Sequence, residues 1–207
     1  MGDIYPTTCL SIKTEIDNSP GQLVGGFVGP GDIKYVNVPN RYGKYDGVIG
    51  QNDRVPLGDP TTPEIVYGFG PSFRWKGWDF SFFFQGVAKT SLFMSNLQPF
   101  GEGFVRNLQT FIAENIEPDN QNIHATYPRL TAIENKNNSQ TSLYWMRDGD
   151  FLKLKNMELG YTYKSMRFYL RGSNLLTFSK FDLWDPEQGG GNGLKYPTQR
   201  VFNIGFR

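Results

Sequence analysis

The sequence predicts an all-β protein whose antiparallel strands form part of a transmembrane β-barrel with long extracellular loops. Two stretches carry this prediction, because residues 65–75 and 78–87 place apolar or aromatic residues at every second position. Lys76-Gly77 separates them and predicts a tight turn. A row of large aromatic side chains opposite a row of polar ones suits a barrel wall, with lipid outside and water inside.

The second stretch shows this division most clearly. Only Phe83 interrupts its alternation. One face is aromatic and the other polar, with Trp78, Phe80, Phe82 and Phe84 against Asp79, Ser81 and Gln85.

Composition excludes several other classes. The chain is 38% hydrophobic yet 15% aromatic and holds 24 glycines, a mixture that disfavours a helical protein. It contains no apolar run of about 18 residues, so no membrane-spanning helix is expected. Its net charge is +1 and its basic residues are not clustered, which gives no footprint for nucleic acid. Cys9 is the only cysteine, so neither a disulfide nor a Cys-based metal site is expected.

Alternation resumes in three later strands. In the strand that begins at Phe151, Leu152 and Leu154 share one face, whereas the apolar residues from Met157 to Tyr163 share the other. This change of face predicts a β-bulge near Lys155-Asn156. After a turn at Lys164-Ser165, the next strand alternates cleanly. Its outward residues are Met166, Phe168, Leu170, Leu176 and Phe178, and its inward residues include Arg167, Tyr169, Arg171, Ser173 and Thr177. The last strand runs from Gln199, with Phe202, Ile204 and Phe206 outward.

Loop lengths predict the topology. The two short turns would be periplasmic, and the long segments 27–63, 89–150 and 179–197 extracellular. Residues 104–113 have apolar positions at helical spacing and predict a short helix, and His124 is expected to be a solvated loop residue. Five strands cannot close a barrel, so we expect the last strands of a larger one, or a misassembling fragment of one.

The ends of the chain give two further expectations. The first residues have no basic start and apolar core of a secretory signal, and since a barrel protein must be exported, we expect the chain to begin inside a larger protein. Residues 1–29 are predicted to be an irregular segment, and residues 30–207 to hold the barrel strands and loops, with no plug domain.

Several motifs occur in an order that resembles the C-terminal third of SusC/RagA-type TonB-dependent outer-membrane transporters. The resemblance runs from about residue 30 to the end of the chain. The motifs are Gly31-Asp32-Ile33-Lys34-Tyr35, Asn52-Asp53-Arg54, Lys76-Gly77-Trp78-Asp79, Phe83-Phe84-Gln85-Gly86-Val87, Asp148-Gly149-Asp150-Phe151-Leu152-Lys153-Leu154 and Arg171-Gly172-Ser173-Asn174-Leu175-Leu176.

The resemblance implies a plugged barrel of about 22 strands in the outer membrane of a Gram-negative cell. Such a transporter would import an oligosaccharide or a peptide, work with a SusD-like lipoprotein lid and take energy through TonB. This chain would supply barrel wall and substrate-side loops, with no catalytic residue and no cofactor. Residues expected to face the lumen or the substrate are Asp79, Gln85, Arg167, Arg171 and Trp184, and a structural role in the wall is favoured for the first four.

The loop around Asp46-Gly47 resembles a family segment that often carries a calcium-binding pattern. Here the early carboxylates are absent, and Arg41 and Lys44 add charge of the wrong sign. Asp46 and Asp53 are therefore weak calcium candidates, and we favour an ordinary extracellular turn.

Other functions have weaker support. Asp185 and Glu187 could be a glycosidase pair, but a spacing of two in a loop fixes no geometry. Trp184 could stack on a sugar, although an aromatic cap on its loop is favoured. The alternatives for the chain are a soluble all-β carbohydrate-binding module, against which inward arginines and very long loops argue, and a truncated product without activity.

Overall fold

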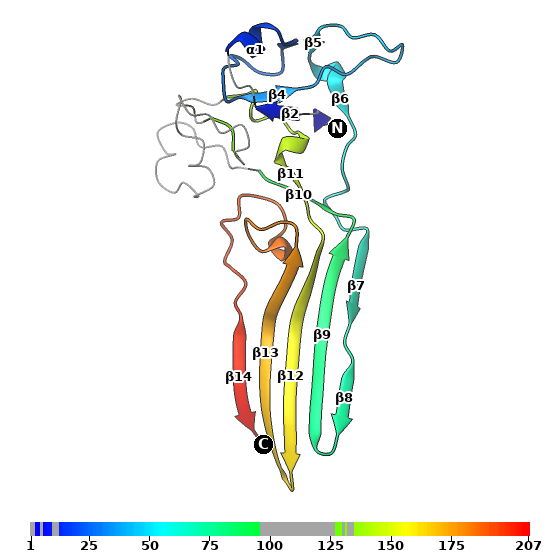
Figure 1. Cartoon of the computed structure of the whole chain (residues 1–207), viewed down its shortest axis with the longest axis vertical. Coiled ribbons are helices and arrows are strands. Elements are labelled where there is room, and N and C mark those ends of the chain that lie inside the picture. Colours follow the sequence, from blue (N-terminus) through cyan, green and yellow to red (C-terminus); the bar gives the residue numbers. More distant parts are fainter. Residues whose placement is uncertain (1–2, 5, 10–12, 96–126, 130, 132–134) are drawn as a thin grey trace. The chain divides into compact units, whose positions relative to one another are not determined.

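The computed structural model describes the chain except for residues 1–2, 5, 10–12, 96–126, 130 and 132–134 (Figure 1). Contacts divide the chain into two compact units, one formed by residues 1–58 and 96–145 and the other by residues 59–95 and 146–207. The helix predicted over residues 104–113 and the loop histidine His124 lie outside the described residues.

The second unit is an antiparallel sheet in which consecutive strands are neighbours, in the order β14-β13-β12-β9-β7, with β8 also paired to β9 (Figure 1). The prediction of antiparallel strands is confirmed. The strands are β7 (Ile65–Phe69), β8 (Ser72–Trp75), β9 (Trp78–Ala88), β12 (Phe151–Tyr163), β13 (Met166–Ser179) and β14 (Val201–Phe206). A two-stranded sheet of β10 (Ser91–Phe93) and β11 (Met146–Asp148) and the 3-10 helix η4 (Pro186–Gln188) complete this unit.

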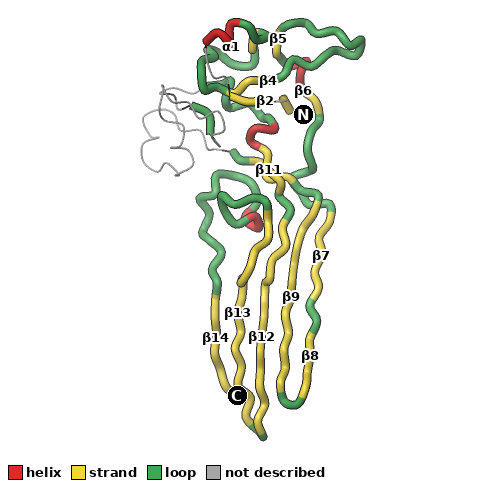
Figure 2. Tube along the Cα trace, viewed as in Figure 1, coloured by secondary structure: helices red, strands yellow, loops and turns green. Residues whose placement is uncertain are grey.

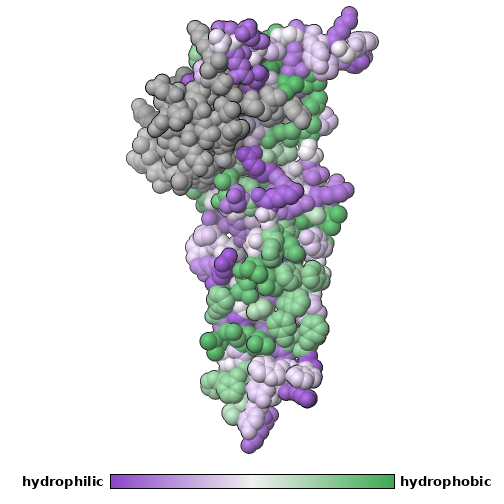
Figure 3. Space-filling view, viewed as in Figure 1, coloured by the Kyte–Doolittle hydropathy of each residue, from purple (hydrophilic) through white to green (hydrophobic). Residues whose placement is uncertain are grey.

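One face of the sheet is covered with large apolar side chains, and we call it the aromatic face. Several of these residues are more than half exposed, including Trp75, Phe73 and Ile204, the last at 87%. Figure 3 shows hydrophobic side chains gathered over the strands, with hydrophilic residues toward the turns. The cross-strand rows of this face are Trp78–Tyr161–Phe168–Phe206, Phe80–Leu159–Leu170–Ile204 and Phe82–Met157–Gly172–Phe202.

Both predicted tight turns are present. Lys76 and Gly77 join β8 to β9 with φ of 44° and 88°, the left-handed region that two-residue hairpin turns require. A Cβ at Gly77 would lie 2.8 Å from the Thr162 carbonyl oxygen, so a larger residue would also clash with the adjacent strand end. Lys164 and Ser165 join β12 to β13, with Lys164 at φ 53°.

The predicted bulge in β12 is confirmed. Its register with both β9 and β13 shifts between Leu154 and Asn156. Against β9, Lys155 is an inserted residue, whereas on β13 two residues, Asn174 and Leu175, lie opposite it. The insertion explains the change of parity in the sequence, because it keeps Leu154 and Met157 on the aromatic face together although they are three residues apart.

The first strand of the sheet is interrupted, and Figure 2 shows the break between β7 and β8. Pro71 lies in the break and has no amide hydrogen to donate, which an edge strand tolerates. Phe83, the residue that breaks the alternation of β9, packs its ring over Gly68 and Gly70. A Cβ on either glycine would lie 3.0 or 2.8 Å from that ring.

The described part of the first unit consists of short elements. Among the described residues, no helix is long and apolar enough to cross a membrane. Residues 1–29, for which the sequence predicts an irregular segment, contribute four of these elements, and the boundary at residue 29 stays a prediction. The elements are β1 (Asp3–Ile4), β2 (Pro6–Cys9), α1 (Lys13–Asp17), β3 (Gly21–Gln22), β4 (Ile33–Tyr35), β5 (Val48–Ile49), η1 (Gln51–Asp53), β6 (Arg54–Val55) and η3 (Leu143–Trp145).

A buried carboxylate organises this unit. Asp32 is 0% exposed and accepts hydrogen bonds from the Gly29 amide at 2.7 Å, from Nδ2 of Asn138 at 2.9 Å and from Nε and Nη2 of Arg129 at 2.8 and 2.9 Å. A buried charge is stable only when it is paired and hydrogen-bonded, as here. Asp32 therefore joins two segments of the unit that are about a hundred residues apart in the sequence.

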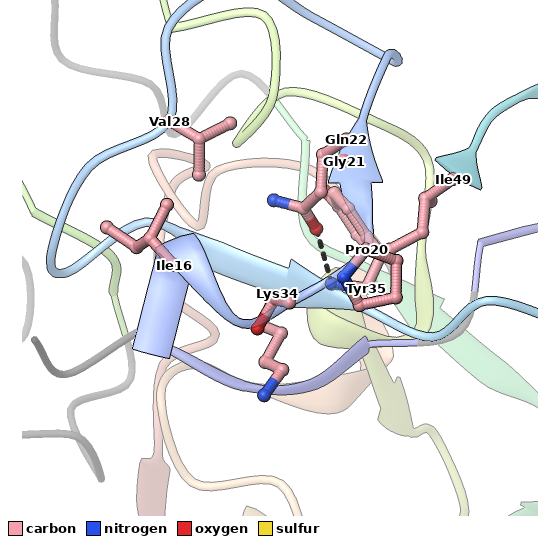
Figure 4. A pocket seen from close by; sticks show the side chains of 9 residues that line it. Ile16, Pro20, Gly21, Gln22, Val28, Lys34, Tyr35 and Ile49 are labelled. Carbon is pink, nitrogen blue, oxygen red and sulfur yellow. Dashed lines mark hydrogen bonds between the residues drawn. The ribbon is translucent and has the colours of Figure 1, made fainter. Parts of the chain in front are cut away.

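A small cavity of about 60 Å³ lies beside β4 in the same unit (Figure 4). Gln22 lines the cavity and is hydrogen-bonded to β4. Its Oε1 accepts from the Tyr35 amide at 2.6 Å, and its Nε2 donates to the Ile33 carbonyl at 3.2 Å. These bonds tie β3 to β4 side by side. The cavity is small and its polar lining is already hydrogen-bonded, so we assign it a packing role.

Candidate functional site

The sheet has a polar face opposite its aromatic face, and the register between strands defines it. Residues directly paired across antiparallel strands project to the same side. Arg167 lies two residues before Tyr169 on the same strand and so shares this face. The rows of the polar face are Asp79–Gly160–Tyr169, Ser81–Glu158–Arg171 and Gln85–Lys153–Thr177.

Arg167 forms the first charged cluster of the polar face. Its Nε donates to Oδ1 of Asp79 at 3.2 Å, and its Nη2 donates to Oδ2 of Asp79 and, at 2.6 Å, to Oε1 of Glu158. The three residues come from three strands. One guanidinium therefore bridges two carboxylates, and Asp79 and Arg167, both predicted to face the lumen, are ion-pair partners.

Arg171 and Gln85, the other predicted lumen-facing residues, lie on the same face by register. Within the described part of the chain, neither side chain has an ion-pair or hydrogen-bond partner. Arg171 is exposed and Gln85 half-buried. The guanidinium group of Arg171 and the amide group of Gln85 are therefore free to bind another molecule or segment. Their role at a lumen stays a prediction.

A second charged cluster joins β12 to the segment between β13 and β14, which we call the β13–β14 loop (residues 180–200) (Figure 1). The ammonium group of Lys153 donates to Oδ2 of Asp185 at 2.5 Å and to Oε2 of Glu187 at 2.8 Å. Lys155 donates to the other oxygen of Glu187 at 2.5 Å. Lys153 is only 1% exposed, so the loop encloses its charge almost completely.

Electrostatics keep both loop carboxylates ionised. Burial raises the pKa of Asp185, but hydrogen bonds, first that from Lys153, outweigh burial and hold the pKa below its ordinary 3.8. Burial likewise raises the pKa of Glu187, while hydrogen bonds from Lys153 and Lys155 hold it below 4.5. At neutral pH the cluster is two lysines against two carboxylates.

The loop has a local structure of its own. Asp185 caps η4, accepting from the Glu187 amide at 3.1 Å. Trp184 donates from Nε1 to the Gly189 carbonyl at 3.0 Å and stacks edge-on against Phe181, with ring centroids 4.6 Å apart. A Cβ on Gly193 would lie 2.6 Å from the Trp184 ring. These contacts support the aromatic-cap role of Trp184 that the sequence favours.

A cavity of about 350 Å³ lies between this loop and the polar ends of β12 and β13. Its lining includes Lys153, Thr177, Trp184, Asp182 and Arg200. Within the described residues, Asp182 and Arg200 have no ion-pair or hydrogen-bond partner. The cavity lies on the face that the sequence predicts to line the lumen.

The two carboxylates of the loop do not have the arrangement of a glycosidase pair. Such a pair flanks a substrate bond, with one carboxyl group protonated and the other free. Here Asp185 and Glu187 bind the same ammonium group, and both have a lowered pKa. The geometry supports an ion-pair role for both.

The weak calcium candidates serve the backbone of the first unit. Asp46 accepts from the Val48 amide at 3.1 Å. Asp53 accepts from the Val38 and Gly50 amides, each at 2.7 Å. Three or more His, Cys, Asp or Glu side chains do not gather anywhere in the described ranges in a way that could hold a metal ion. Both residues thus have the turn-forming contacts of an ordinary loop.

Sequence reasoning missed Lys153 and Lys155 as site residues. Their spacing placed them on one face of a predicted strand, and the predicted bulge lay beside them. Their carboxylate partners, however, are 32 and 34 residues away in a loop without periodicity.

Comparison with known proteins gives relatives of one kind. Two curated relatives from Formosa agariphila, the TonB-dependent receptors P26 and P3, are 31% and 30% identical to the chain over 186 and 184 residues, each match covering 78% of the chain. Solved structures of the RagAB peptide importer in its open-open state and of the RagAB peptide transporter share the fold. Their TM-scores are 0.61 and 0.62, at 21% identity over 85% of the chain. The chain belongs to the TonB-dependent receptors.

This TonB-dependent receptor chain spans 18% of the length of each curated relative and 20–21% of the matched RagAB chains. No protein-family model matches it. The relatives are named as receptors and importers and not as enzymes. The fold prediction of antiparallel barrel-type strands is thereby confirmed.

Proposed function

We propose that the chain supplies barrel wall and substrate-side loops to a TonB-dependent nutrient transporter in the outer membrane of a Gram-negative cell. The observation that carries this proposal is the aromatic face, which extends over β8, β9, β12, β13 and β14 and has polar rows directly behind it. An exposed apolar surface of this extent needs a covering, and lipid supplies it for a barrel wall.

The polar face would then line the lumen. Arg167 pairs with Asp79 and Glu158 on the wall, whereas Arg171 and Gln85 remain available to a substrate or to an internal plug. The complete transporter would be a plugged barrel of about 22 strands that imports an oligosaccharide or a peptide. None of these residues has a catalytic role in this proposal.

We propose two partners for the complete transporter. The RagAB structures are described as a peptide importer, and we propose that the complete transporter likewise pairs with a SusD-like lipoprotein lid and takes energy through TonB. The long segments 27–63, 89–150 and 179–197 would be extracellular, on the side where such a lid binds.

Cysteine labelling in intact cells tests the topology. In a Cys9→Ser background, Leu194→Cys would place a thiol in the β13–β14 loop, where Leu194 is 64% exposed. Ser165→Cys would place one in the opposite turn. A membrane-impermeant maleimide should label the first in intact cells and the second only after lysis. Equal labelling of both in intact cells, or no membrane association, would refute the proposal.

A further inference from the structure

The β13–β14 loop is held within its unit by charge and by a backbone pairing, in which Gly191 donates to the Phe93 carbonyl at 2.9 Å and accepts from the Ser95 amide at 3.0 Å. Its central contact is Lys153, whose ammonium group lies between Asp185 and Glu187 and is almost fully enclosed. The part of the loop that follows is much more exposed, with Leu194 at 64% and Tyr196 at 79%. The loop is therefore anchored from Asp185 to Gly191 and is exposed from Leu194 to Arg200.

The charges around Lys153 balance without help from other elements. Lys155 on the same strand shares Glu187, and Asp182 and Arg200 line the same cavity with opposite signs. The neighbours of Lys153 across the sheet, Gln85 on β9 and Thr177 on β13, are uncharged. Asp185 and Glu187 are therefore the direct charge partners of Lys153, and neither strand neighbour could replace them.

We propose that Lys153, assisted by Lys155, is a latch that holds the β13–β14 loop folded over the polar face, and that the cavity beneath the loop exists only while this latch is closed. With the latch broken, Lys153 would be a buried unpaired ammonium group, which is strongly unfavourable. The part of the loop before Gly191 would then move away from the wall, and water would reach both Lys153 and the inner surface of the loop. More of the polar face would then be exposed at this point. The latch is therefore a conformational switch within the wall.

Limited chymotrypsin digestion of the purified chain in detergent tests the latch, with cleavage after Phe181 or Trp184, which are buried and half-buried in the loop, followed by mass spectrometry. Proteolysis at such a site follows the population of the open loop. Lys153→Met should accelerate this cleavage about tenfold or more, because removal of one partner leaves the other charges buried. The double variant Asp185→Asn/Glu187→Gln should do the same without any change in a strand. Lys164→Met, a lysine in the exposed turn at the other end of β12, is the matched control and should leave the rate unchanged.

Two further readouts separate a latch from a general loss of structure. The β signal in circular dichroism should be the same in all variants, because the latch contacts only the loop. The fluorescence of Trp184 is the part of the wild-type signal that Trp184→Phe removes. Lowering the pH toward 3 should increase its quenching by acrylamide in the wild type and should have little effect in the double variant.

Cleavage at the wild-type rate in Lys153→Met, or acceleration by Lys153→Met but not by the double variant, would overturn the latch. The proposal needs only the fold of this chain, so its failure would leave the transport proposal standing. A chain that shows no β structure in detergent would instead refute both.

Discussion

Arg167 on β13 and Asp79 on β9 form an ion pair across β12, the strand that lies between them. Gly160 is the β12 residue beneath the pair, and a Cβ there would lie 2.6 Å from the Arg167 Nη2 atom and from both Asp79 carboxylate oxygens. The two charged side chains can meet because this position has no side chain. A glycine in a central strand, usually unfavourable, thus permits a contact between strands that are not neighbours.

Gly160→Ala should therefore separate Arg167 from Asp79 and destabilise the sheet. Overpacking of a tight site typically costs about 1–3 kcal/mol. Heat-modifiability on gels and thermal melting in detergent would measure the loss. Gly21→Ala is a suitable control, because a Cβ at Gly21 meets nothing within 4 Å. Equal melting of the two variants would refute the role assigned to Gly160.

The two faces can be told apart by substitutions at adjacent positions of one strand. Phe82→Arg places a charge on the aromatic face, where a barrel wall near the bilayer midplane loses about 2–4 kcal/mol. Ser81→Arg places the same charge on the polar face and should have a small effect. Folding titrations into lipid vesicles would measure both variants. A larger loss for Ser81→Arg would mean that the faces are assigned in reverse.

Asp32 should dominate the stability of the first unit. Asp32→Ala would leave Arg129 without its carboxylate and the N–H donors of Gly29 and Asn138 without an acceptor. Such a change costs about 3–5 kcal/mol of stability at buried ion pairs. Hydrogen exchange of the Ile33 and Tyr35 amides would report the loss. Asp46→Asn, at an exposed turn, is the control, and similar exchange in both variants would contradict the assignment.

The β13–β14 loop should confer acid-sensitive stability. The folded pKa values of Asp185 and Glu187 lie below 3.8 and 4.5, so the stabilisation is complete above these values and is lost as the pH falls through the folded pKa values. The difference in melting temperature between the wild type and Asp185→Asn/Glu187→Gln should be constant from pH 7 to about 5 and should shrink below about 4. A difference that grows in acid would contradict the sign.

The strands of the sheet were predictable because their pattern is local. Alternation located β9 and β13, the parity change located the bulge at Lys155, and Lys76-Gly77 located a turn. Even the exception, Phe83, has a local cause in Gly68 and Gly70 on the paired strand.

Contacts between distant segments could not be predicted in this way. The elements of the first unit are two to five residues long, too short to show a period. The pairing of Lys153 with Asp185, and of Asp32 with Asn138, depends on how loops fold back, which no spacing in the sequence specifies. The lumen-facing role of Arg171 and Gln85 remains a prediction.

The most direct test of the central claim is fractionation of the expressed chain with and without detergent, followed by circular dichroism of the dissolved material. If the aromatic face meets lipid, the chain will stay in the membrane or pellet fraction in plain buffer and will dissolve with a β signal only in detergent. A monodisperse, β-rich species in plain buffer would contradict the barrel-wall account and would favour a soluble all-β module.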